Sequence, residues 1–535
     1  MPRHGWLTIS LLLTLAVDVY VAARSPAIAP DGVTFIEMAR ELQRAPLNVM
    51  RAQDQHPGYP ALVVGAHAML ALDGADESLR PSAGKWIVAG KLVAIACGLG
   101  CVALVWLIAR RMYDRHIADI TSLLAAGLPV LRQNAADVLS DTPHLCAYLL
   151  AAWCLQEGFA RSSRRWFLAA GMASGCAFWI RPEGLSVAIV GGFLVAVSFC
   201  LGRLPRRQTA LYGMTLLCGV GMIAGPYVVL TGKLTSKKDP LAASQKPVAY
   251  EMPFVDAQPT PSASAAPTVQ VASAIEVTPA PSGDWSPRVV AAAKKYFVEL
   301  GYGFGYVVWI PWAFGHFAPG RKRPLGSSLG LLASLAMLHS VLLIWLALMA
   351  GYLGHRHVMP IVGVAFPAAA AGIEWLGRRG GELVRRPHWA PQCAFAISLT
   401  LVAVAIPFSI RQINSVASPI VTAADWIRTE SSSRQTLLAN SRYPRLYAEL
   451  NGPIFGVDVT DLGGALQTVQ PDFVLLDVDT RAFTPPSAAE LGGAYEPAFE
   501  TRGEGNRTWH RVLVFRRVSP TTAPELRASG PNGLR

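Results

Sequence analysis

The sequence predicts an all-α bundle of membrane-spanning helices followed by a small C-terminal α/β domain. Of the 535 residues, 52% are hydrophobic and 15% are charged, whereas soluble domains carry about 25% charged residues. The mean hydropathy is +0.34, and apolar runs long enough to cross a bilayer recur along the chain. The tail instead alternates helical patterns with short buried strands such as PDFVLLDV and RVLVFRRV, as small α/β domains do.

The net charge of +12 does not indicate a nucleic-acid partner. The basic residues fall in short clusters between apolar runs rather than along one face, so they set membrane topology. All eight cysteines lie inside apolar runs, where they act as small hydrophobic residues. The sequence therefore predicts neither a disulfide framework nor a zinc site.

About eleven membrane spans are expected from the length of the apolar runs. Arg3 and His4 precede the first run, 6–23, and no small-residue cleavage site follows it, so it is interpreted as an uncleaved span with Asp18 near its outer end. The other expected spans are 86–109, 118–131, 142–157, 166–180, 184–201, 209–230, 300–318, 325–353, 358–376 and 393–410.

The distribution of arginine and lysine predicts the orientation of these spans. Five short loops carry three or four basic residues each, whereas the short turns that alternate with them carry only Arg132, Arg181 or Arg356. Because cytoplasmic loops hold the basic excess, the N-terminus is expected inside and these three arginines outside. The short apolar run 59–72 must then not cross the membrane.

Three regions are expected on the outer side: a catalytic loop at 24–85, a second loop at 231–295 and the tail. Residues 240–287 are rich in Pro, Ala, Ser and Thr, a composition typical of extended or disordered segments. The domain boundaries expected are 1–411 for the membrane domain and 412–535 for the outer α/β domain.

The opening loop carries a candidate general base. Thr34 and Glu37 have the spacing of a capping box, which predicts a short amphipathic helix that begins at Thr34 and lies on the membrane surface. Asp31 then has no capping duty and is available at the outer mouth of the bundle. The alternative is that Asp31 and Gly32 simply form a turn after Pro30.

Further along the same loop, the segment DQHPGYP places three polar side chains around two prolines. Asp54, His56 and Tyr59 can bind a hydroxylated substrate, and Asp31 with His56 can hold a divalent cation. The alternative is that the prolines merely stiffen the entry to the next helix.

Asp137 and Asp141 are a second acidic pair. They share a helix face if the helix continues through Ser140 and can then orient the acceptor or help Asp31 to hold a cation. It is equally consistent that Asp141 caps the next span, with Pro143 in its first turn.

These segments together resemble the GT-C integral-membrane glycosyltransferases that use polyprenyl-phosphate sugars. An aspartate after the first span, an amphipathic helix and HPGYP resemble the start of that family. It includes the protein O-mannosyltransferases, the aminoarabinose transferase acting on lipid A and the core-sugar transferases of rhizobial lipopolysaccharide. The later segments LRQNAADVLSDTPHLCAYLLAAWCL, GMASGCAFWIRPEG, GHRHVMPIVGVAFPAAAAGI and AADWIRTE follow in the family's order.

The resemblance implies transfer of a sugar from a polyprenyl phosphate to an acceptor hydroxyl, with inversion, at the outer face of a bacterial inner membrane. Many relatives carry a second acid directly after the loop aspartate, but here that position is Gly32. This difference leaves Asp31 as the single best candidate for the base that takes the acceptor's proton.

A lipid-phosphate leaving group requires fixed positive charge as its own negative charge develops. Arg356, flanked by His355 and His357, is the first candidate to bind the phosphate; Arg181 and then Lys233 follow. The alternatives are headgroup contacts for the arginines and an ordinary solvated loop for the lysine.

The expected partners are a polyprenyl-phosphate-linked sugar, membrane lipids and an envelope glycolipid, polysaccharide or protein acceptor, with a divalent cation left open. The rival function is a transporter or flippase of lipid-linked substrates, since polar residues at span ends also serve transport. The sequence shows no inverted repeat of the kind common in transporters.

Overall fold

A computed structural model of the chain divides into two compact units, Met1–Gln245 with Val277–Asn414 and Lys246–Glu276 with Ser415–Arg535. It describes residues 5–53, 55–70, 83–232, 234, 286–306, 308–317, 328–431, 435–450, 454–456, 462–479, 481, 491, 493–503 and 510–518. The expected disordered segment lies almost wholly outside these ranges, as do Asp54 and Lys233.

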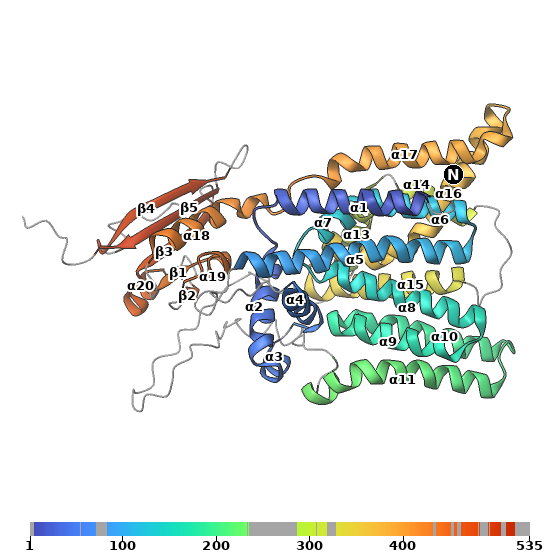
Figure 1. Cartoon of the computed structure of the whole chain (residues 1–535), viewed down its shortest axis with the longest axis horizontal. Helices are drawn as coiled ribbons and strands as arrows, with labels where there is room; N and C mark the ends of the chain where they lie inside the picture. Colours follow the sequence, from blue (N-terminus) through green and yellow to red (C-terminus); the bar gives the residue numbers. More distant parts are fainter. Residues whose placement is uncertain are drawn as a thin grey trace, which may run out of the picture. The chain divides into compact units, whose positions relative to one another are not determined.

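The first unit is all-helical, with its long helices side by side (Figure 1). Seven helical segments of the described chain are long and apolar enough to cross a membrane, so this is a multi-pass membrane protein; the count of eleven remains a prediction. The helices are α1 (Gly5–Arg24), α2 (Pro30–Arg44), α3 (Pro46–Ala52), α4 (Gly58–Met69), α5 (Ala83–Met112), α6 (Arg115–Gly127), α7 (Pro129–Ala135), α8 (Asp141–Arg161), α9 (Arg164–Ile180), α10 (Leu185–Cys200), α11 (Arg206–Thr231), α13 (Ser286–Gly303), α14 (Trp309–Phe317), α15 (Ser328–Ala350), α16 (Met359–Leu383) and α17 (Ala390–Ser409), with short 3-10 turns η1 (Pro182–Gly184), η2 (His355–Val358) and η3 (Pro387–Trp389). The 3-10 turn η4 (Ser415–Ala417) belongs to the second unit.

Two of the expected spans are each divided into two helices. The run 118–131 breaks at Leu128, whose backbone is extended and precedes Pro129 at the start of α7, because a proline disfavours helical geometry in the residue before it. The run 300–318 breaks between α13 and α14, where Gly305 and Tyr306 both have a φ of 58°. Helix α13 also begins at Ser286, inside the region expected to be a loop.

The opening loop forms three short helices, and the predicted helix start is wrong. Helix α2 begins at Pro30 rather than at Thr34, which lies inside it. Proline suits the first helical position because its fixed φ is helical and it has no N–H to leave unpaired. Asp31 is therefore in the first turn of α2. The predicted amphipathic pattern is confirmed by the burial of Phe35, Ile36 and Leu42.

Helix α4 has 12 residues, fewer than the ~17 needed to span a bilayer. Tyr59 in its first turn is fully buried. Its ring lies edge-on to Phe35, with the centroids 5.2 Å apart, and its hydroxyl donates to the carbonyl of Gly90 at 3.1 Å. Tyr59 thus joins α4 to α2 and α5, which fixes the opening loop on the bundle.

Helices α9 and α11 pack closely against each other. A Cβ at Gly171 in α9 would lie 2.1 Å from the Leu216 carbonyl oxygen of α11, and one at Gly219 would lie 2.3 Å from that of Leu168. Small residues let membrane helices approach this closely. The end of α9, which carries Arg181 as its C-cap residue, is therefore held firmly by its neighbour.

The second unit confirms the predicted α/β domain. Helices α18 (Ser418–Glu430), α19 (Tyr443–Tyr447) and α20 (Leu462–Val469) accompany a five-stranded sheet in the order β2-β1-β3-β5-β4. The strands are β1 (Leu437–Ala439), β2 (Ile454–Gly456), β3 (Phe473–Asp479), β4 (Tyr495–Arg502) and β5 (His510–Arg517). Strand β1 pairs in parallel with β2 and β3, whereas β5 is antiparallel to β3 and β4.

Candidate active site

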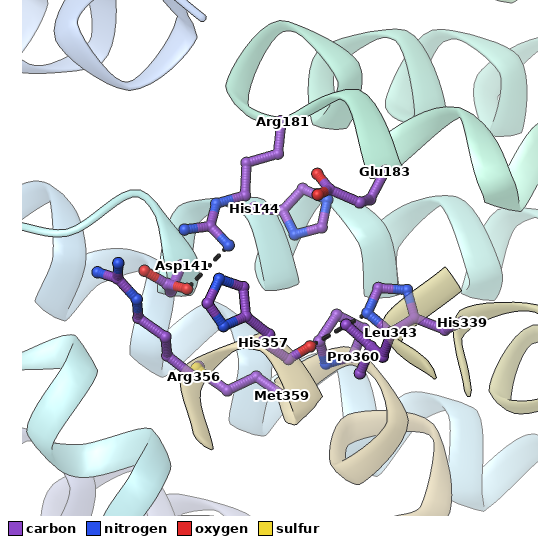
Figure 2. Close-up of a pocket in the computed structure, with 10 residues that line it drawn as sticks. All are labelled: Asp141, His144, Arg181, Glu183, His339, Leu343, Arg356, His357, Met359 and Pro360. Carbon is purple, nitrogen blue, oxygen red and sulfur yellow. Dashed lines mark hydrogen bonds and ion pairs between the residues drawn. The ribbon is translucent and has the colours of Figure 1, made fainter. Parts of the chain in front are cut away.

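A polar pocket lies within the first unit, where α8, η1, α15, η2 and α16 meet (Figure 2). It combines two arginines, two carboxylates and three histidines, which is an unusual concentration of polar groups for a membrane bundle. Its lining residues are Asp141, His144, Arg181, Glu183, His339, Leu343, Arg356, His357, Met359 and Pro360.

Arg356 joins the late turn η2 to the opening loop. Its Nη2 atom lies 2.6 Å from Oδ2 of Asp31, and the two side chains are 24% and 38% exposed. The predicted base and the predicted phosphate ligand, distant in sequence, are therefore in direct contact. Asp31 is accessible, and its carboxylate is paired with Arg356.

Arg181 makes the second ion pair of the site. Its Nη1 atom lies 3.0 Å from Oδ1 of Asp141, without the geometry of a hydrogen bond, so the two attract as charges. Its Nε donates to the hydroxyl of Ser140 at 3.1 Å. Asp141 opens α8 but does not cap it, because the N-cap residue is Ser140.

Asp137 does not share a helix face with Asp141, because the chain turns between α7 and α8. It is buried and ties three segments together instead. Its Oδ1 accepts from the amides of Ala29 at 3.1 Å and Val138 at 2.7 Å, and its Oδ2 accepts from Nδ2 of Asn414 at 2.8 Å. Burial raises the pKa of Asp137, although these hydrogen bonds oppose the shift. Asp137 thereby fixes the segment that leads into Asp31.

Of the three histidines that line the pocket, one was predicted from the sequence and two were not. His357 was predicted, and its Nδ1 lies 3.1 Å from the amide nitrogen of Gly354 in the same turn. His144 and His339 were missed, although a histidine inside an apolar run is the signal that marks a functional polar residue in a membrane helix. Nε2 of His339 lies 3.2 Å from the carbonyl oxygen of His357. Glu183 of η1 also lines the pocket.

Five predicted site residues within the described ranges do not line this pocket: Asp31, Asp137, His355, His56 and Tyr59. His355 contacts the ring of Tyr302, with centroids 4.6 Å apart. His56 is buried against the rings of Phe178 and Tyr227, at 5.1 and 5.3 Å. Asp31 and His56 thus have different neighbours, and the described part of the chain contains no group of three His, Cys, Asp or Glu residues suited to a metal ion.

A family model described as dolichyl-phosphate-mannose-protein mannosyltransferase matches residues 83–226 of this chain. That segment contains Asp137, Asp141, His144, Arg181 and Glu183. Among curated proteins, none matches the sequence.

Solved structures match this chain along nearly all of its length at low sequence identity. ArnT from Cupriavidus metallidurans bound to undecaprenyl phosphate has a TM-score of 0.59 and 14% identity, over 98% of this chain and 100% of that one. The oligosaccharyltransferase of Archaeoglobus fulgidus in the apo form has a TM-score of 0.55 and 11% identity, over 95% of this chain and 74% of that one. AglB from the same organism, in complex with an inhibitory peptide and a dolichol-phosphate, has a TM-score of 0.52 and 11% identity, over 98% and 75%. The chain has the fold of the GT-C membrane glycosyltransferases.

Proposed function

We propose that this protein is a glycosyltransferase that moves a sugar from a polyprenyl phosphate to an acceptor hydroxyl. The observation that carries the proposal is the meeting of Asp31, Arg356, Asp141 and Arg181 at one site. Glycosyl transfer from a lipid phosphate needs a carboxylate for the acceptor's proton and cations for the leaving phosphate. The partial match to a mannosyltransferase family and the fold of ArnT point in the same direction.

Each group then has a role in an inverting displacement. Asp31 takes the proton of the acceptor hydroxyl as its oxygen forms a bond to the anomeric carbon. The bond between that carbon and the phosphate oxygen breaks at the same time, and Arg356 and Arg181 stabilise the charge left on the phosphate. His357 lies beside both arginines and offers a further ring nitrogen (Figure 2).

The structural neighbours also support a proposal for the donor lipid. Two structural neighbours are complexes with a polyprenyl phosphate, ArnT with undecaprenyl phosphate and AglB with dolichol-phosphate. For this chain we propose an undecaprenyl-type phosphate sugar, a hexose or a pentose, as donor. The acceptor is an envelope glycolipid, polysaccharide or protein.

The proposed setting is a bacterial inner membrane with the N-terminus in the cytoplasm and the site and the C-terminal domain outside. Two contacts support this orientation. Arg111 pairs with Glu157 at 3.4 Å, and His116 pairs with Glu374 at 3.1 Å. Basic segments that follow α5, α8 and α16 therefore gather at one end of the first unit, as the positive-inside rule expects.

The decisive experiment replaces Asp31 with Asn, which keeps the shape and removes the base. Membranes with wild type or Asp31→Asn are supplied with undecaprenyl phosphate carrying radiolabelled glucose, galactose, mannose, arabinose or ribose, and envelope fractions are counted and analysed by mass spectrometry. We expect transfer to fall at least 10²-fold, the usual contribution of a general base, at an unchanged protein level. Asp425→Asn, which removes a half-exposed carboxylate paired with Arg428 at 3.1 Å, is the matched control and should transfer normally.

Wild-type transfer by Asp31→Asn would refute the assignment of the base. Movement of labelled lipid across the membrane without transfer to any acceptor, in the wild type itself, would instead favour the flippase.

A further inference from the structure

A group of buried polar side chains, His144, Tyr148, Ser186 and His339, lies deeper in the first unit than the two ion pairs. His144 and Tyr148 are on α8, Ser186 is on α10 and His339 is on α15; all four are at most 4% exposed. The ring of Tyr148 lies 5.9 Å from that of His144 and 6.2 Å from that of His339. We call these four residues the inner cluster.

The inner cluster has polar atoms that the described protein does not satisfy. Nε2 of His144 and Nδ1 of His339 are buried without a hydrogen-bond partner among the described residues. The Tyr148 hydroxyl approaches that of Ser186 without reaching hydrogen-bond geometry. Buried polar atoms almost always have partners, because leaving one unpaired is costly. Several at one place indicate a site that a polar ligand completes.

The inner cluster is continuous with the arginine end of the pocket. Figure 2 shows Arg356 and Asp141 at one side and His339 with Leu343 at the other, and His144 lies between them. A ligand whose phosphate contacts the arginines therefore has its next atoms within reach of these histidines.

The chemistry of the inner cluster suits hydroxyl groups rather than a second phosphate. Histidine, tyrosine and serine each offer both donors and acceptors, as sugar hydroxyls require. The carboxylate of Glu183 borders the same part of the pocket and repels an anion, but it accepts hydrogen bonds from hydroxyls. Leu343 and Pro360 supply an apolar wall for the C–H groups of a ring.

We propose that the inner cluster is the subsite for the glycosyl ring of the donor, with His144 and His339 as residues that determine sugar specificity. This inference rests on the proposed function. It assigns the arginine end to the phosphate and the inner cluster to the sugar, so the two ends can be tested separately.

Two substitutions remove only the unpartnered nitrogens. His339→Gln places an amide nitrogen where Nε2 meets the His357 carbonyl and deletes Nδ1; His144→Asn retains a group at the Nδ1 position and deletes Nε2. His116→Asn, at the Glu374 pair outside the pocket, is the matched control. Unfolding midpoints in detergent are compared first, and a variant that unfolds is replaced by Tyr148→Phe, which removes one hydroxyl.

Binding is measured by tryptophan fluorescence with bare undecaprenyl phosphate and with the same lipid carrying glucose, galactose, mannose, arabinose, ribose or galacturonic acid. We expect wild type to bind at least one of the sugar-bearing lipids more tightly than the bare lipid. His144→Asn and His339→Gln should weaken binding of that lipid about fivefold to tenfold, a loss of the size of one hydrogen bond. Both should bind the bare lipid within about twofold of wild type.

Three outcomes would overturn the inference. Equal loss of affinity for bare and sugar-bearing lipid would assign the inner cluster to the phosphate. Unchanged affinity for both would mean that it holds water only. Equal affinity of wild type for bare lipid and for every sugar-bearing lipid would remove the glycosyl subsite while leaving the phosphate site intact, whereas no binding of any of these lipids would refute the proposed function itself.

Discussion

The Nη2 atom of Arg356 lies 2.6 Å from Oδ2 of Asp31, so the candidate phosphate ligand and the candidate base neutralise each other. A donor phosphate that binds Arg356 must compete with this carboxylate. Once the phosphate takes over the guanidinium, the carboxylate of Asp31 is released to accept the acceptor's proton.

This competition predicts that Asp31→Asn binds bare undecaprenyl phosphate more tightly than wild type does, although it transfers no sugar. The gain should be about threefold to fivefold, because a half-exposed ion pair contributes up to about 1 kcal/mol. Tryptophan fluorescence titration with the bare lipid measures it. Weaker binding by the variant would show that Asp31 supports the phosphate site rather than competing for it.

Arg356→Gln should lower the transfer rate about 10²-fold, because it removes the charge that stabilises the leaving phosphate. Arg356→Lys should lose less, since it keeps the charge but not the planar guanidinium. Initial rates at saturating and limiting donor separate binding from turnover. Arg379→Gln, at an exposed pair with Glu382 at 2.8 Å, is the control, and a rate for Arg356→Gln equal to that of this control would contradict the assignment.

The raised pKa of buried Asp137 predicts a pH-dependent contribution to stability. Below about pH 4, the usual aspartate value, the group is protonated in the folded and unfolded states. As the pH rises from there toward the higher folded pKa, only the unfolded state releases the proton, so the stabilisation is progressively lost. As the pH rises from 4 to 8, the unfolding midpoint of wild type should therefore fall relative to that of Asp137→Asn and then level off. A wild-type midpoint that rises relative to that of the variant would contradict the raised pKa of Asp137.

A buried ion pair between α1 and α7 offers a separate test of the bundle. Nη1 of Arg132 lies 2.7 Å from Oδ2 of Asp18, and both side chains are fully buried. Asp18→Asn or Arg132→Gln alone should destabilise the protein by about 3–5 kcal/mol, because each leaves a buried charge unpaired. The double substitution Asp18→Leu with Arg132→Met should recover most of that loss, as measured by thermal unfolding in detergent. Additive losses in the double variant would mean that the two residues do not act as a pair.

Features that depend on local composition could be predicted from the sequence. Apolar runs predicted the helical membrane unit, and short apolar strands between helical patterns in the tail predicted its sheet. These signals depend on residues that are neighbours in the chain, so they survive in the folded protein. Local signals also compete, as at α2, where Pro30 and not Thr34 begins the helix.

Which polar groups meet depends on how distant segments of the chain pack together. Asp31 pairs with Arg356, Asp137 accepts from Asn414, and His144 shares a pocket with His339. Each of these pairings joins segments that are far apart in the sequence, and their relative position is set by side-chain packing, which leaves no local pattern. The sequence therefore predicts a membrane enzyme with an acid after its first span. The packing of α15 against α8, and of η2 against α15 and α16, brings the arginines and the inner cluster together, and Arg356 of η2 holds that acid.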